Sequence, residues 1–539
     1  MHLNERRVGA KRRVGDRAKD RAARAGRRLR ASDGYTMAMT LMGGLLMSMI
    51  VVSAVAAVNG DINTTRADVD HKRAYEAALT GLAAYSYQLN KDQNYWEKCT
   101  SVPSPNALNQ VGSTTNRRPV PGGSGATYAI ELIPAAGQTS CSTADPTGTM
   151  IEQGVAADGT FRIRSTGFSA GQDEAVVATY SKEGLLDYIY FTQYETMDPV
   201  TFGAVPWAAD AYAHCTRTRQ EGRQSAPIPN SGGVFCLTIV FIGGEQINGP
   251  LHSNDTLVIC GNPRFGRVDG SGNPIGDHIE TAAPPTGWVD FCGGANPNFG
   301  SGLDTNARVL TPPPTNTTLQ YKTTSSYIFS GRTKFDLNTT NMTVTRYDGS
   351  IVTMAYPASG VVYVKNISCG ITYTPYGPNY SAGTGCGDAV VKGNYDDRLT
   401  IAAENDVLIE GNLTRSGDGM LGLIANNFVR VYHPCDRSTS TNLAGALSNL
   451  RIDAAILAIQ HSFINDNFDC GAPLGTLTIN GALAQRFRGP VGQFNASGPV
   501  HGYSKNYTYD NRLKYVQPPH FLDPVQTAWH IDRQSLDDG

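Results

Sequence analysis

The longest apolar stretch of the sequence lies near its start. Residues 37–58 read MAMTLMGGLLMSMIVVSAVAAV and contain no charged side chain. A helix of this length measures about 33 Å, and the hydrocarbon core of a bilayer is about 30 Å thick. The pattern therefore predicts one transmembrane helix, over residues 35–60.

The pattern after this stretch is that of an amphipathic helix. Small and apolar residues recur every three or four positions, and Arg66, Asp70 and Arg73 fall between them. This spacing predicts that the helix continues as a stalk over residues 61–95, whereas a plain juxtamembrane linker would not need it. The expected apolar face consists of Ile62, Val69, Ala74, Ala77, Ala78, Leu82, Tyr85 and Leu89.

Alternating apolar and polar positions appear next. Strand-like runs cover residues 126–133, 160–168, 174–182 and 185–195. Because strands this close together in sequence form hairpins most readily, we expect one antiparallel sheet within residues 96–195.

Short apolar runs separated by Gly-Asn and Asn-Asp turns fill residues 196–539. Runs of four to six residues at irregular intervals favour a right-handed β-helix or a similar solenoid, in which stacked turns share one core. One or two β-sandwiches are the alternative. The sequence as a whole therefore predicts a mainly β protein with a long N-terminal α-helix.

Charge divides the chain into two parts. Residues 1–34 contain twelve Lys or Arg against four Asp or Glu, a balance of +8 that leaves about −10 of the total of −2 for the rest. The positive-inside rule places this basic leader in the cytoplasm and the bulk of the chain outside. A cleaved signal peptide ending near Ala54, Ala56 and Ala57 is the competing interpretation. Nucleic acid is not an expected partner, because no aromatic residue is interleaved with the leader's positive charges.

All ten cysteines follow the apolar stretch. None forms a CxxC pair, so a zinc site is not expected, and an even number outside the membrane fits disulfides in an oxidising space. We expect sequential pairing, most clearly for Cys99–Cys141, Cys215–Cys236 and Cys369–Cys386, with free buried thiols as the alternative. The remaining candidates are Cys260, Cys292, Cys435 and Cys470.

The N-terminal ninety residues resemble those of PilX-type minor pilins. The resemblance rests on the basic leader, Gly34 followed by Tyr35, the long apolar helix, and the segment DVDHKRAYEAALTGLAAYSYQL at 68–89. It implies cleavage by a leader peptidase between Gly34 and Tyr35, and helix packing in a pilus or pseudopilus core. The sequence departs from major pilins at the fifth mature position, where Met39 replaces a glutamate.

Three later segments resemble a domain of unknown function that is joined to PilX-type N-termini in bacterial envelope proteins. They are INGPLHSND with CGNPRF, GNYDDRLTIAAENDVLIEGNLT, and residues 502–525. This family implies no catalytic residues.

Two motifs of energy coupling and zinc-dependent hydrolysis are missing from the sequence. It contains no GxxxxGK[ST] and no HExxH, so an assembly ATPase and a zinc protease are not indicated. The string His252-Ser253-Asn254-Asp255 holds residue types of acyl transfer, but neighbours in a strand point to opposite faces. We expect a turn there in which Asn254 and Asp255 cap the backbone.

Two residue groups allow a second interpretation. Carboxylates at 396–410 could act on polysaccharides or hold calcium, although solvated loop carboxylates are the simpler interpretation. C-terminal aromatic residues could form a binding platform or belong to the core. The groups are Asp396, Asp397, Glu404, Asp406 and Glu410, and Tyr503, Tyr507, Tyr509, Tyr515 and Phe521.

These patterns predict a single-pass structural protein of the cell envelope that is not an enzyme and has no cofactor or metal. It would resemble a minor pilin or pseudopilin and present a β-rich domain for pilus assembly or surface attachment. The expected partners are the membrane, other pilin-like subunits, and a surface glycan or adhesion target. The alternatives are a membrane-tethered β-helix enzyme acting on carbohydrate and an adhesin outside any filament.

Overall fold

The computed structural model describes most of the chain after the basic leader. It describes residues 35–92, 95–99, 112, 114–143, 146–151, 160–182, 184–202, 208–369, 385–495, 498–514, 516–525 and 529–537. The leader 1–34, with Gly34, lies outside the described residues. The described chain is mainly β, with one long N-terminal helix and an antiparallel sheet, and this level of the sequence prediction is confirmed.

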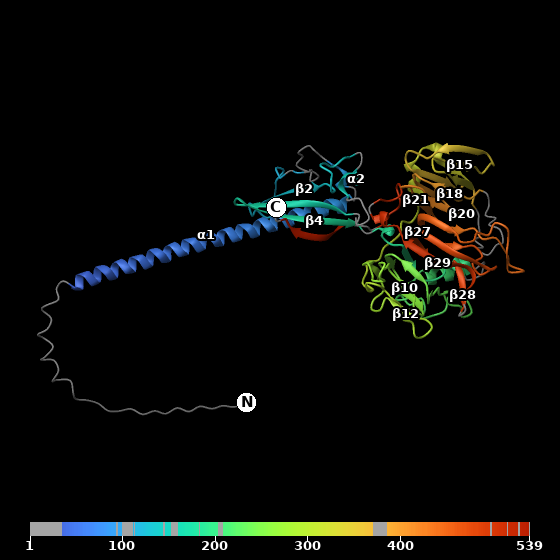
Figure 1. The fold of residues 1–539 in the computed structure, drawn as a ribbon, viewed down its shortest axis with the longest axis horizontal. Coiled ribbons are helices and arrows are strands. Elements are labelled where there is room, and N and C mark those ends of the chain that lie inside the picture. Colours follow the sequence, from blue (N-terminus) through green and yellow to red (C-terminus); the bar gives the residue numbers. More distant parts are fainter. Residues whose placement is uncertain are drawn as a thin grey trace, which may run out of the picture.

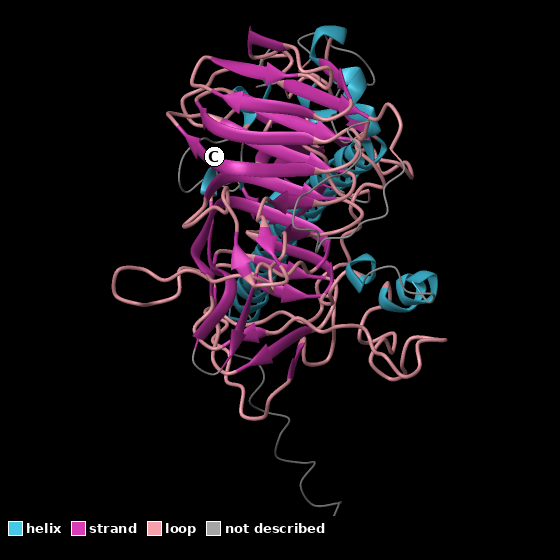
Figure 2. Ribbon diagram, turned by 90° about the vertical axis from the view of Figure 1, so that its right-hand side faces the viewer, coloured by secondary structure: helices cyan, strands magenta, loops and turns pink. Residues whose placement is uncertain are grey.

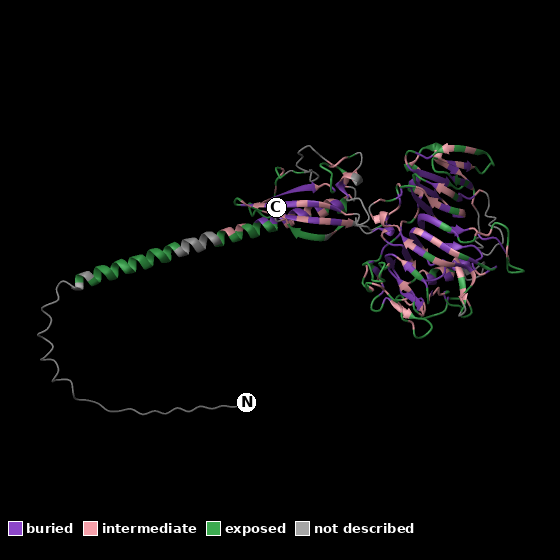
Figure 3. Cartoon of the chain, viewed as in Figure 1, coloured by how far each residue is buried: buried purple, intermediate pink, exposed green. Residues whose placement is uncertain are grey.

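The N-terminal helix α1 (Tyr35–Lys91) is continuous over 57 residues, which corresponds to about 85 Å. Its first part projects alone with exposed side chains, and its last turns lie along a sheet (Figures 1 and 3). Val69 is exposed, but the apolar face is buried from Ala74 to Leu89. The expected stalk is therefore packed against the sheet from Ala74 to Leu89.

A five-stranded antiparallel sheet covers this end of α1, and the two together form the head domain. The strand order is β1-β2-β3-β4-β30. The last strand comes from the C-terminal end of the chain, so the head also contains residues beyond the range 96–195. The strands are β1 (Arg118–Pro119), β2 (Thr127–Ile133), β3 (Phe161–Ser169), β4 (Gln172–Lys182) and β30 (Trp529–Leu536).

The helix and the sheet approach each other closely at Gly167. A Cβ atom at this position would lie 1.9 Å from the carbonyl oxygen of Ala74, so only glycine fits. Nearby, the hydroxyl of Ser165 donates a hydrogen bond of 2.8 Å to the carbonyl of Ala78. The core between helix and sheet is aromatic and includes Tyr85, Trp96, Phe161, Tyr180 and Trp529.

Residues 184–525 form a second unit, the body domain, in which strands lie one above another (Figure 2). Its 20-stranded sheet is paired mostly in parallel; the exceptions are β14–β15, β15–β16 and β28–β29. The strands are β5 (Tyr190–Tyr194), β7 (Gln246–Asn248), β8 (Leu251–Ser253), β10 (Arg264–Phe265), β11 (Ile279–Thr281), β13 (Ile328–Ser330), β14 (Thr333–Leu337), β15 (Asn341–Thr345), β16 (Ile351–Ala355), β17 (Val361–Lys365), β18 (Ala389–Tyr395), β19 (Arg398–Ala403), β20 (Val407–Arg415), β21 (Met420–Ala425), β22 (Val429–Val431), β25 (Arg451–Ala458), β26 (Phe463–Asn465), β27 (Pro473–Phe487), β28 (Gly492–Asn495) and β29 (Gly498–Tyr509).

Smaller elements complete the two domains. A three-stranded parallel sheet and a two-stranded sheet flank the large one, and short helices lie in the connections. These elements are β6 (Phe241–Ile242), β9 (Leu257–Cys260), β12 (Trp288–Asp290), β23 (Cys435–Asp436), β24 (Thr441–Asn442), α2 (Pro146–Met150), α3 (Ala208–Cys215), η1 (Tyr95–Glu97), η2 (Leu185–Asp187), η3 (Pro199–Phe202), η4 (Thr317–Lys322), η5 (Ser325–Tyr327) and η6 (Asn511–Lys514).

One ladder of parallel pairs shows how the chain fills the body domain. Its order is β13, β17, β19, β21, β25, β27, β5, β8 and β11. The chain enters at β5, in the interior of the ladder, and proceeds to one end at β11. It then crosses to the other end at β13 and returns strand by strand until β27 pairs with β5. We call this contact of β27, β5 and β8 the seam.

Buried charges lie at the seam. Glu195 follows β5 directly and accepts hydrogen bonds from Arg488 Nη1 at 3.1 Å and from the hydroxyl of Tyr190 at 3.2 Å. Asp255, just after β8, accepts one from the backbone N–H of Glu195 at 2.9 Å and pairs with Arg223. All four charged side chains are buried. Removing one partner of such a buried ion pair lowers stability by about 3–5 kcal/mol. These pairs therefore fix how β27, β5 and β8 pair at the seam.

The crossing from β11 to β13 is made by residues 305–327, which we call the strap. It runs past the ends of several stacked strands and is held there by amide side chains. Asn254 accepts a hydrogen bond of 3.0 Å from the backbone N–H of Leu310, and Gln460 donates one of 2.5 Å to the carbonyl of Pro314.

The deepest strap residue is Asn316, whose side chain is fully buried. Its amide donates to the carbonyls of Ala403 at 2.8 Å and Ile424 at 3.2 Å, which belong to consecutive strands of the ladder. Its backbone N–H donates to Asn426 Oδ1 at 2.8 Å. The strap is therefore attached to several strands in succession and ties them together along the stack.

We expect Asn316→Ala to lower the free energy of unfolding by about 2 kcal/mol, because it removes the buried hydrogen bonds to the carbonyls of Ala403 and Ile424. Denaturant unfolding of the full chain in detergent measures this. The control is Asn338→Ala at the exposed turn after β14, where a change below about 0.5 kcal/mol is expected. Equal effects of the two substitutions would contradict the role given to the strap.

Candidate functional site

The exposed first part of α1 is the most unusual surface of the molecule. The window Met39–Ala56 has a mean hydropathy of 2.0, and none of it is buried. The helix is long and apolar enough to cross a bilayer. Met39, the departure from major pilins, is exposed within it. The large apolar side chains exposed here are Met37, Met39, Leu41, Met42, Leu45, Leu46, Met47, Met49, Ile50, Val51, Val52 and Val55.

The few polar side chains of this segment are turned back onto the helix. Thr40, Ser48 and Ser53 each donate a hydroxyl hydrogen bond to the carbonyl three residues earlier, at 3.1, 2.8 and 2.9 Å. In a lipid environment, hydroxyl groups must find partners within the protein. The segment therefore has the chemistry of a surface that is covered by lipid or by other apolar helices.

Five disulfides join the ten cysteines in sequential pairs, and no free cysteine remains. One staples the head and four lie in the body, all beyond the apolar segment of α1. The loops that they close span 17 to 42 residues, and such crosslinks typically contribute about 2–4 kcal/mol. The pairs are Cys99–Cys141, Cys215–Cys236, Cys260–Cys292, Cys369–Cys386 and Cys435–Cys470.

We expect no thiol of the native protein to react with an alkylating reagent until a reductant is added, because disulfides persist in oxidising spaces. Mass spectrometry of envelope-derived protein, unfolded in the presence of the reagent, measures this. Reduction beforehand is the control and should allow all ten cysteines to react. Labelling without reductant would show that the body resides in a reducing space.

The carboxylates at 396–410 have separate partners. Asp406 is buried and pairs with Arg430 at 3.5 Å. Glu404 accepts hydrogen bonds from the backbone N–H of Asn366 at 2.7 Å and from a tyrosine hydroxyl, and Glu410 pairs with Lys334. Asp397 accepts a hydrogen bond from the next backbone N–H. The described residues contain no group of three His, Cys, Asp or Glu side chains arranged to hold a metal ion.

The string from His252 to Asp255 is part of the core. His252 lies between Glu280 at 2.7 Å and Asn254 at 2.9 Å, while Asn254 and Asp255 accept hydrogen bonds from backbone N–H groups. Among the C-terminal aromatic residues, Tyr515 lies outside the described residues. The four others, Tyr503, Tyr507, Tyr509 and Phe521, are buried in the body core.

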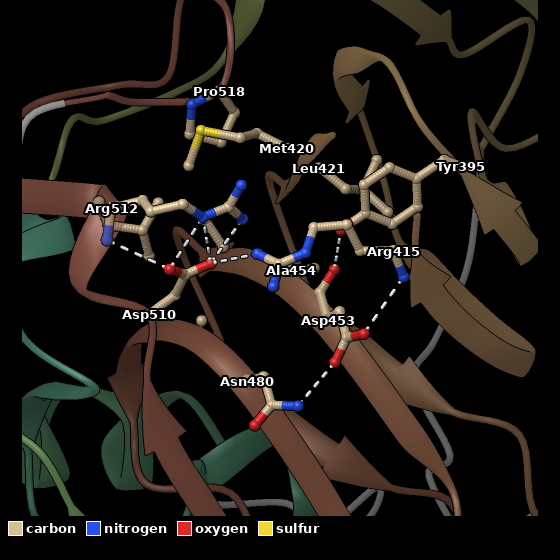
Figure 4. A pocket seen from close by; sticks show the side chains of 13 residues that line it. Tyr395, Arg415, Met420, Leu421, Asp453, Ala454, Asn480, Asp510, Arg512 and Pro518 are labelled. Carbon is tan, nitrogen blue, oxygen red and sulfur yellow. Dashed lines mark hydrogen bonds and ion pairs between the residues drawn. The ribbon is translucent and has the colours of Figure 1, made fainter. Parts of the chain in front are cut away.

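The body contains a small polar hollow (Figure 4). Asp453 accepts hydrogen bonds from Asn480 at 2.8 Å and from Arg451, and Asp510 pairs with Arg415 at 2.8 Å and Arg512 at 2.7 Å. Burial raises the pKa of Asp510 despite the opposing charge of Arg415. The lining consists of Tyr395, Arg415, Met420, Leu421, Asp453, Ala454, Ala455, Asn480, Gly481, Asp510, Arg512, Leu513 and Pro518.

Sequence reasoning missed this hollow. Arg415 ends β20, Asp453 lies near the start of β25, and Asn480 lies in the middle of β27. No local motif links them, so only the register of the ladder brings them together.

Comparison with known proteins leaves the family open. No protein-family model and no curated protein matches the chain. Among solved structures, the competence-associated pilin ComZ from Thermus thermophilus is weakly similar: the TM-score is 0.31 at 13% identity, over 87% of this chain and 98% of that one. At this level the similarity assigns neither a fold family nor a function.

Proposed function

We propose that this protein is an envelope-anchored structural protein of the minor-pilin-like kind, which holds a β-rich body outside the cell. The observation that carries the proposal is the exposed apolar window Met39–Ala56, at the free end of a helix whose other end is packed in a folded head. A surface of this size is unfavourable in water, at about 25 cal/mol per Å² of apolar area. We therefore expect this surface to be covered by a bilayer or by a bundle of similar helices.

The proposal includes the shape of the body. Parallel ladders that return to neighbouring strands support a β-solenoid more than a sandwich, because sandwiches are built from antiparallel sheets. Such a body would serve as a stiff, disulfide-stapled platform for attachment. Four of the five carboxylates of 396–410 are engaged in separate contacts, so we propose a binding or structural role and no catalytic one.

We expect the double substitution Leu46→Lys/Met47→Lys to release the protein from the membrane fraction. Each lysine at the centre of a transmembrane helix costs about 3 kcal/mol. The matched control is Tyr75→Lys/Tyr87→Lys, which places the same charges at exposed positions of α1 outside the window. Carbonate-washed membranes measure the distribution. A double variant that stays in the membrane as firmly as the control would contradict the anchor.

The filament form of the proposal adds cleavage of the leader between Gly34 and Tyr35. We expect the mature chain to begin at Tyr35, because that residue follows the glycine of the pilin-like motif. Mass spectrometry of the terminal peptide from envelope fractions tests this. An intact basic leader would limit the protein to a permanent single-span anchor.

A further inference from the structure

The tripeptide Asn-X-Ser/Thr, in which X is not proline, occurs ten times in the sequence. This tripeptide, the sequon, is the acceptor signal for an N-linked glycan, and it is used on surface loops of exported proteins. Because the chain is rich in Asn and Thr, the signal alone does not single out an acceptor. The structure distinguishes sequons that a transferase can reach from those that it cannot.

Two sequons with the same letters, Asn-Thr-Thr, have opposite surroundings. Asn316 is the buried strap residue, and its Nδ2 donates to two carbonyls in the core. Asn338 lies in the turn between β14 and β15, where all three residues of the sequon are exposed. Its Nδ2 makes only long contacts, at 3.5 Å to the carbonyl of Asp336 and 3.3 Å to Asn341 Oδ1. Contacts of this length are weak, so this nitrogen is available to a reactant.

The other sequons are less accessible. Among those whose three residues the structure describes, only 338–340 and 366–368 are exposed throughout. The side-chain carbonyl of Asn366 already accepts a hydrogen bond of 2.6 Å from the backbone N–H of Gly387. The sequons at Asn412 and Asn506 lie within strands β20 and β29, and their middle residues are buried. Asn338 is therefore the most accessible amide of this set.

A carboxylate faces the same side as this amide. Along β14, Phe335 and Leu337 are buried while Asp336 is exposed, and exposed Asn338 continues the alternation. Residues two apart in a strand point to the same face. Asp336 also pairs with Lys392 at 3.4 Å, but both side chains are about half exposed, and such pairs are weak. One face of the hairpin thus presents an acidic group and a free amide together.

The position of the turn leaves room for a bulky group. Figure 1 places β15 at one end of the body. There β14 pairs with β18 on one side, and β15 and β16 extend the sheet on the other as antiparallel strands. The hydroxyl of Tyr356 donates to the carbonyl of Asn338 and anchors the turn. A group attached to the exposed amide needs no rearrangement of the stacked strands.

We propose that Asn338 is the acceptor of an N-linked glycan, with Thr340 as the hydroxyl residue of its sequon and Asp336 as a recognition residue. In the transfer, Asn338 Nδ2 forms a bond to the anomeric carbon of a sugar carried on a lipid diphosphate. The bond from that carbon to the diphosphate oxygen breaks, and the lipid diphosphate leaves with the electron pair. A base of the transferase takes the amide proton. This inference rests on the proposed function, because acceptors of this kind lie on exported surfaces.

The test is peptide mass spectrometry of the full chain, purified from membranes of cells that produce it naturally. The expected result is a mass increase equal to a sum of sugar residues, located on Asn338 by fragmentation that leaves the glycan attached. Asn338→Gln and Thr340→Ala should abolish the increase, whereas Thr340→Ser restores the hydroxyl and should keep it. Asp336→Asn keeps the shape without the charge and should lose most of the glycan.

The matched control is Asn341→Gln, which removes the next sequon of the same hairpin and should leave the glycan in place. Because Asn338 is exposed, Asn338→Gln should unfold at the same denaturant concentration as the wild type.

Three outcomes overturn the assignment: an unmodified Asn338, a glycan on the hairpin that persists in Asn338→Gln, and a glycan on buried Asn316 in place of Asn338. Protease protection of the body in the same cells reports separately on the proposed function. An unmodified Asn338 on a body that external protease degrades would therefore remove the glycan and leave the envelope role intact.

Discussion

The body domain depends on one contact, the pairing of β5 with both β27 and β8 at the seam. β5 is the first strand of the body along the chain, and β27 is among the last, so the ladder becomes continuous only when nearly the whole body has been wound. Buried ion pairs such as Glu195 with Arg488 fix the register of this contact, because a shifted register would leave unpaired charges in the core. The strap is the geometric consequence. A chain whose first strand lies in the interior of the stack must cross to the far end of the stack before its later strands can pair with that first strand.

Two chain connections join the head domain and the body domain. The body lies between β4 and β30 in the sequence, and both of these strands belong to the head sheet. The chain therefore passes from head to body and back, and two connections hold the body, where a domain at a chain terminus would have one. This double attachment restricts rotation of the body relative to the head more than a single connection would. In the head, Gly167 allows β3 to lie directly on α1, because a side chain at this position would clash with the helix backbone.

The local sequence pattern was enough to predict those elements that depend on interactions between residues close in the sequence. An uncharged stretch of 22 residues predicts the exposed helix, and alternation predicts the antiparallel sheet of the head. The placement of β5 and β30 could not be predicted in this way, because each pairs with strands that are distant in sequence. The run 185–195 looks like one more strand of the head sheet, yet Tyr190–Tyr194 lies in the body. The hollow was missed for the same reason, since Arg415 and Asn480 meet only through the register of the stack.

The measurement that tests the account most directly is protease protection in sealed spheroplasts of a strain producing the protein, followed by mass spectrometry of what remains. The account predicts that external protease degrades the body and head, while the residues up to the end of the apolar window, near Ala56, stay protected until the membrane is opened. A body that survives intact until lysis would place the bulk of the chain inside, and the envelope-anchored role would then be wrong.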